Sequence, residues 1–71
     1  MTHQANTYRQ LTHDEIDLIS EIKNKSKEVG SLVEKLALAG NVDIRWLGIA
    51  NDSLQIGFMA LVRSVAKPPS Y

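Results

Sequence analysis

The sequence contains no cysteine, so neither a disulfide nor a cysteine-ligated zinc site can support its fold. Its four glycines are scattered over 71 residues, which excludes a glycine-rich phosphate-binding loop. Eight Lys and Arg residues balance eight Asp and Glu residues, so there is no excess of either charge. Because proteins that bind duplex nucleic acid usually show a basic excess, we expect no duplex partner. A small anionic ligand, held by a few converging cations, is not excluded.

Long hydrophobic runs are absent as well. Residues 1–9 are polar, so we expect no signal peptide. The most apolar segment, residues 46–66, is interrupted by Asn51, Asp52, Gln55 and Arg63, whereas a membrane-spanning helix needs about 20 predominantly apolar residues. Together with the lack of cysteine, these absences predict a cytoplasmic protein with no membrane partner.

The chain does contain enough apolar residues to fold. Hydrophobic residues make up 44% of the sequence and charged residues 23%, which argues against disorder. A single domain of this size, however, buries only about 60% of the surface of its unfolded chain. Since disulfides cannot help, we expect the chain to gain stability by associating with further copies.

A first helix is predicted over residues 13–39. Thr12 and Glu15 fit a capping box, in which each side chain accepts a hydrogen bond from the other residue's backbone amide. Residues 13–39 contain no proline that would interrupt the helix. Gly40-Asn41 then supplies a left-handed helix end. Residues 1–10 show no apolar periodicity and are predicted to form an extended arm.

A second helix is predicted over residues 44–67. Asp43 can cap its start, and Pro68-Pro69 cannot continue it, which leaves residues 68–71 as a mobile tail. The short connection at residues 40–42 makes the two helices antiparallel neighbours. The predicted fold is therefore all-α: a two-helix hairpin over residues 11–67 that assembles into a homo-oligomer.

Apolar side chains recur at helical spacing along both segments. The stripe of the first helix is Leu18, Ile19, Ile22, Val29, Leu32, Val33 and Leu36. The stripe of the second is Trp46, Leu47, Ala50, Leu54, Gly57, Phe58, Leu61 and Val65, with a second cluster at Ile49, Ile56 and Ala60. Because one partner helix covers only one face, we expect other subunits to cover the rest, and Trp46 and Phe58 to be core residues.

Groups suited to catalysis are scarce. His13 falls in the first helical turn, where a solvated role is typical, and no serine–histidine signature accompanies it. The carboxylates of that turn are explained by capping and by the helix dipole rather than by a metal. We therefore predict no enzyme, no metal site and no cofactor.

The cations form a better candidate site. Lys23 borders the apolar stripe near small residues and could reach an anion or a flat ring; the alternative is a snorkelling surface lysine. Tyr8-Arg9 pairs a ring that can stack on a base with a guanidinium that can bind phosphate, although Tyr8 could instead anchor the arm. Arg63 lies on the polar side of the second helix, where the alternative is an ordinary helix-end cation.

Two segments of the second helix carry a family resemblance. Residues 45–50 (Arg-Trp-Leu-Gly-Ile-Ala) and 54–66 resemble the helical-hairpin family of small phage proteins whose studied members are anti-CBASS sponges. Residues 57–63 (Gly-Phe-Met-Ala-Leu-Val-Arg) are the most specific part. Residues 8–12 and Ile22-Lys23 resemble the start of the same family, so the similarity spans nearly the whole chain.

The resemblance implies a hexamer of hairpins that binds cyclic di- or trinucleotides, the alarm signals of bacterial CBASS immunity. These ligands would be sequestered in the host cytoplasm without being cleaved. By the same resemblance, Tyr8 and Lys23 sandwich the bases, and Arg63 contacts phosphate. Weaker matches to ligand-contacting positions fall at Arg9, Lys25 and Ser26.

Two other functions remain open at this point. The second apolar cluster also suits a structural or protein–protein interaction hairpin that caps a host protein. A small helical DNA-binding protein is a third alternative, but the balanced charge does not favour it.

Overall fold

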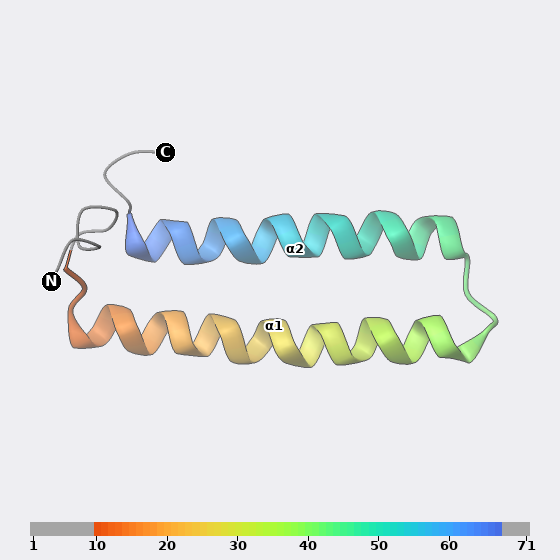
Figure 1. The fold of residues 1–71 in the computed structure, drawn as a ribbon, viewed down its shortest axis with the longest axis horizontal. Coiled ribbons are helices and arrows are strands. Elements are labelled where there is room, and N and C mark those ends of the chain that lie inside the picture. Colours follow the sequence, from red (N-terminus) through yellow and green to blue (C-terminus); the bar gives the residue numbers. More distant parts are fainter. Residues whose placement is uncertain (1–9, 68–71) are drawn as a thin grey trace, which may run out of the picture.

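The computed structural model describes residues 10–67 and consists of two long helices joined by a short connection (Figure 1). Helix α1 spans His13–Ala39 and helix α2 spans Ile44–Ala66. They lie antiparallel and side by side, so the start of α1 is beside the end of α2 (Figure 1). The prediction of an all-helical hairpin is confirmed. The predicted arm, apart from Gln10, and the predicted tail fall outside the described residues.

Helix α1 begins at the predicted capping box. The Thr12 hydroxyl accepts a hydrogen bond from the Glu15 amide at 3.1 Å, and the Thr12 amide donates to the Glu15 carboxylate at 2.9 Å. These bonds satisfy two backbone donors that the helix itself leaves without partners. At the other end, Gly40 has a φ of 81°, the left-handed conformation that glycine adopts without strain.

Removing the Thr12 hydroxyl tests the contribution of this cap. We expect Thr12→Ala to lower the free energy of unfolding by about 1 kcal/mol, because the Glu15 amide loses its acceptor. Thermal denaturation followed by circular dichroism, at one fixed protein concentration, measures the effect. Thr12→Ser keeps the hydroxyl and is the matched control. Equal midpoints for Thr12→Ala and the parent protein would show that the box contributes nothing.

Helix α2 begins at Asp43, whose carboxylate accepts a hydrogen bond from the Trp46 amide at 3.0 Å. It ends at Ala66, one residue before the predicted end. Lys67 has a φ of 47°, in the left-handed region, and its amide donates to the Arg63 carbonyl at 2.7 Å. The difference has a local cause, because the proline at position 68 disfavours the right-handed helical conformation at the residue before it.

The two helices meet along one row of half-buried residues on each. On α1 these positions alternate in steps of three and four, as in a coiled coil. The α1 row is Glu15, Ile19, Ile22, Ser26, Val29, Val33 and Leu36. The α2 row is Leu47, Asn51, Phe58, Val62 and Val65. We call these two rows the seam.

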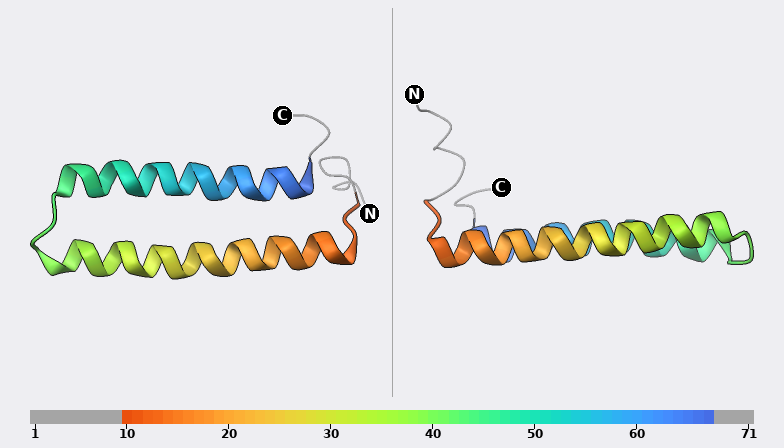
Figure 2. Two further views of the ribbon diagram at one scale, coloured as in Figure 1. Left: turned by 180° about the vertical axis from the view of Figure 1, so that it is seen from behind. Right: turned by 90° about the horizontal axis from the view of Figure 1, so that it is seen from below.

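The hairpin is a single layer one helix thick (Figure 2). Most side chains outside the seam are therefore exposed. Among residues 10–67, Ala66 alone is buried. Phe58 lies in the seam as predicted, but Trp46 is 62% exposed, and the prediction that it is a core residue is wrong for the single hairpin. One residue along a helix is a turn of about 100°, so Trp46 points sideways while its neighbour Leu47 faces α1. Neither described helix is long and apolar enough to cross a membrane.

Candidate functional site

The lysines predicted on α1 lie on different faces of the hairpin. Lys23 and Lys25 are two residues apart, which turns their side chains roughly 200° from each other around the helix. Lys25 lines a hollow together with Leu18 and Leu61. Gly30, seven residues after Lys23 and therefore on almost the same side, lines a different cavity.

The linings of these hollows define two faces. One face carries Gly30 and Gln55. Lys23 belongs to the same face because it precedes Gly30 by seven residues, or about two turns, and we call it the Lys23 face. The other carries Lys25, Gly57 and Leu61, and we call it the Lys25 face. The hairpin is one layer thick (Figure 2). Because Lys23 and Lys25 are turned roughly 200° from each other, these two faces look in opposite directions.

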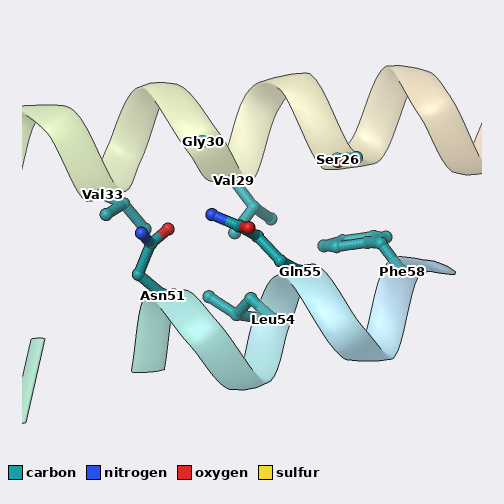
Figure 3. Close-up of a pocket in the computed structure, with 8 residues that line it drawn as sticks. All are labelled: Ser26, Val29, Gly30, Val33, Asn51, Leu54, Gln55 and Phe58. Carbon is teal, nitrogen blue, oxygen red and sulfur yellow. The ribbon is translucent and has the colours of Figure 1, made fainter. Parts of the chain in front are cut away.

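A cavity of about 120 Å³ lies between the helices and borders the Lys23 face (Figure 3). Its apolar lining comes from Val29, Val33, Leu54 and Phe58, and its polar lining from Ser26, Asn51 and Gln55. The amide side chains of Asn51 and Gln55 project from α2 toward α1 (Figure 3). Ser26, predicted as a ligand contact, is a half-buried seam residue that lines this cavity.

Sequence reasoning did not single out Asn51 and Gln55. The spacing of Asn51 could have indicated that it faces α1, because it follows Leu47 by four residues and precedes Phe58 by seven, as seam residues do. Asn51 thus places a polar side chain in an otherwise apolar row.

Arg63 lies on the same side of the hairpin as Lys23. Arg63 follows Gln55 by eight residues, which is two full turns of the helix plus about 80°. Arg63 is therefore turned away from the seam on the same side as Gln55, the side of the Lys23 face. Lys25, Phe58, Ile22 and Leu61 line a single hollow. In this antiparallel register Lys25 is level with Phe58 and Ile22 with Leu61, so Arg63 is level with the first half of α1. Along the hairpin axis, Lys23 and Arg63 are therefore within about one helical turn of each other.

Both of these cations are available for an anion. Lys23 and Arg63 are exposed, and neither forms an ion pair within residues 10–67. Lys25 does have a partner, because its ammonium lies 3.8 Å from the Glu28 carboxylate. That pair is well exposed, so it stabilises little, but it places a negative charge beside Lys25.

The predicted site is thus divided by the structure. Lys23 and Arg63 share one side, Lys25 lies on the opposite face, and Ser26 lines the seam cavity. Tyr8 and Arg9 fall outside the described residues. Within 10–67, the carboxylates and the histidine do not gather into a group of three that could hold a metal.

Comparison with known proteins identifies the family. The family model of the Acb2/Tad1 hairpin domain matches residues 1–66, which include both helices. The chain is also similar to Anti-CBASS protein 2 of Pseudomonas phage JBD67, at 29% identity over an alignment of 97 positions. That alignment covers 86% of this chain and 88% of the phage protein. The match over nearly the whole hairpin confirms the resemblance seen in the sequence, and the chain belongs to the Acb2/Tad1 hairpin-domain family.

Proposed function

We propose that this protein counters CBASS defence by binding cyclic oligonucleotide messengers and holding them uncleaved. The observation that carries the proposal is a pair of exposed cations, Lys23 and Arg63, on one side of a hairpin of this family; neither forms an ion pair within residues 10–67. Similarity to a protein named for its anti-CBASS role supports the class of ligand. We infer that the protein acts as a homo-oligomer, and family resemblance suggests a hexamer.

The symmetry of the ligand favours a site between copies. A cyclic dinucleotide has two phosphates and two bases related by an approximate two-fold axis. A two-fold protein interface supplies each contacting residue twice. One Lys23 and one Arg63 from each of two subunits would therefore meet both halves of the ligand, with Tyr8 stacking on a base and Arg9 beside it.

The expected affinity is sufficient for sequestration. Stacking of a base on an aromatic side chain contributes about 1–3 kcal/mol, and a hydrogen bond to a charged group contributes about 1.5–3 kcal/mol. Two copies of each contact give about 5–12 kcal/mol before the losses of motion on binding are subtracted. Micromolar binding needs about 8 kcal/mol net, so it requires contacts near the upper end of these ranges. A preformed pair of rigid helices keeps those losses small on the protein side.

A thermal-shift titration tests the proposal. A 3′,3′-cyclic dinucleotide at about 100 times its dissociation constant should stabilise the folded protein by about 2.7 kcal/mol, because it binds the folded state alone. The linear dinucleotide of the same bases is the matched control. The ligand, released by denaturation, should be recovered intact by mass spectrometry. Absence of binding heat with a panel of cyclic di- and trinucleotides at micromolar protein would contradict the proposal.

An alternative function rests on a different observation. The outer side of α2 exposes Ile49, Ile56 and Met59 at 42%, 63% and 57%. A host protein could cover this patch, which would make the chain an interaction hairpin. In that case no cyclic nucleotide should raise the melting temperature, and Ile56→Asp should abolish a stoichiometric complex with one identified host protein.

A further inference from the structure

Two side-chain amides face the cavity between the helices. Asn51 and Gln55 project from α2 toward α1 and stand one helical turn apart (Figure 3). Neither side chain forms a hydrogen bond with another residue of 10–67. A side-chain amide carries two donors and an acceptor, and leaving them unpaired away from water costs free energy. A ligand that supplies complementary groups would remove this cost.

The cavity is large enough to admit part of a ligand. It measures about 120 Å³, whereas about 10–15 Å³ suffices for one water. Its wall at Gly30 has no side chain, and a Cβ atom there would meet nothing within 4 Å, so packing within the hairpin does not require glycine. Glycine is also less favourable than alanine inside a helix. The missing side chain leaves the cavity open toward the Lys23 face.

The amides lie close to the cations of the proposed site. Lys25 is level with Phe58 along the hairpin, so Gln55 is level with position 28 of α1. That position is five residues, or about 7.5 Å along the axis, from Lys23. Gln55 is exposed on the Lys23 face, and Asn51 lies deeper, in the seam. A base held by Lys23 can therefore turn one of its edges toward Gln55.

The chemistry of an amide discriminates between the purines. A glutamine binds adenine at two points, because its oxygen accepts from N6 and its nitrogen donates to N7. Guanine presents two acceptors, O6 and N7, at the same edge, which leaves the glutamine oxygen unpaired. The other edge of guanine carries an extra donor at N2, and the described residues that line the cavity include no carboxylate to accept it. The amide therefore favours adenine.

We propose that Gln55, supported by Asn51, reads the edge of each base of the bound cyclic dinucleotide and selects adenine. This inference rests on the proposed function and gives its ligand a base preference. Stacking holds any base by its face and tolerates every base type, so the preference must come from a group that meets the edge. In a two-fold site the two bases are read by Gln55 of each subunit in turn.

Isothermal titration with 3′,3′-cyclic di-adenylate and 3′,3′-cyclic di-guanylate tests this role. The parent protein should bind the adenine ligand at least about twentyfold more tightly, since each two-point pair discriminates by about fivefold or more and two bases are read. Gln55→Leu should reduce the preference to less than about threefold, because stacking alone accepts either base. The variant should keep its helices, because Gln55 is exposed and leucine favours helix.

Gln55→Glu separates base reading from a structural role. A carboxylate only accepts hydrogen bonds, so it suits the adjacent N1 and N2 donors of guanine rather than the donor and acceptor of adenine. The preference should turn toward the guanine ligand. Asn24→Leu is the matched control, since it removes an exposed amide that is two residues from Ser26 and thus turned about 200° away from the cavity. Its preference should equal that of the parent protein.

Two kinds of failure can be told apart by these titrations. If the parent protein binds neither ligand, the proposed function fails and the base-reading role of Gln55 fails with it. If the parent protein binds both ligands equally, or if Gln55→Leu keeps the same preference as Asn24→Leu, binding of cyclic dinucleotides stands and the base-reading role is overturned.

Discussion

Replacing Lys23 with alanine is expected to weaken binding of a cyclic dinucleotide by at least a hundredfold. A lysine ammonium held against the face of a base contributes about 2 kcal/mol when it is desolvated, and a two-fold site loses this contact twice. Since 1.4 kcal/mol corresponds to a factor of ten, the loss amounts to two or more factors of ten. Helix content should not change, because Lys23 is exposed and forms no ion pair within the described residues. Isothermal titration measures the affinity, and circular dichroism checks the fold.

Two lysines of the same helix serve as controls. Lys27→Ala removes the same charge one turn further along, and Lys25→Ala removes it from the opposite face. Lys25→Ala should change the affinity by less than about fivefold, because its charge lies on the opposite face and is screened. Lys27→Ala should cost more than Lys25→Ala but less than Lys23→Ala, because Lys27 lies one turn from Lys23 on nearly the same side. Equal losses for all three variants would indicate a diffuse attraction between cations and ligand. An unchanged affinity for Lys23→Ala would remove Lys23 from the site.

The ends of the helices could be predicted from the sequence because their interactions are local. The capping bonds of Thr12 with Glu15, and of Asp43 with the Trp46 amide, each join residues three apart. Such contacts depend on residue type and spacing and on nothing elsewhere in the chain. The left-handed turn at Gly40 has the same local origin.

The face by which α2 meets α1 could not be predicted in the same way. Periodicity fixes the angle between any two residues of one helix, but it does not say which angle points at the partner. Because α2 is apolar over more than one face, the stripe containing Trp46 and the seam through Asn51 and Val62 both fit the pattern. In the structure the row through Asn51 and Val62 packs against α1, and Trp46 is therefore exposed.

The candidate site likewise has features that follow from local helix geometry and features that depend on tertiary packing. The separation of Lys23 from Lys25 follows from helix geometry alone, since two residues turn the side chain by roughly 200°. The common side of Lys23 and Arg63 depends on which way α2 lies against α1 and on their register, and both are tertiary properties. Sequence reasoning could therefore name these cations individually but could not show that they lie together.

Phe58 connects the two faces of the hairpin, and its truncation should have the largest effect on stability. Its ring lines the seam cavity on one side and both hollows on the Lys25 face on the other. Fully buried Phe→Ala changes cost about 3–5 kcal/mol, so a half-buried ring in a row of smaller side chains should contribute about 2–3 kcal/mol. Small domains have about 5–15 kcal/mol in all, so Phe58→Ala should lower the unfolding midpoint severely.

Urea denaturation at one fixed protein concentration measures this loss, and the choice of control decides what it means. Ile56→Ala truncates an apolar side chain two residues earlier that is 63% exposed and faces away from α1. If the seam holds the hairpin together, Ile56→Ala should cost less than about 1 kcal/mol while Phe58→Ala costs at least twice as much. If the two losses are equal, contacts between subunits rather than the seam determine the stability of the folded chain. Phe58→Leu distinguishes volume from shape, because a leucine refills most of the space between the helices and should restore more than half of the lost free energy.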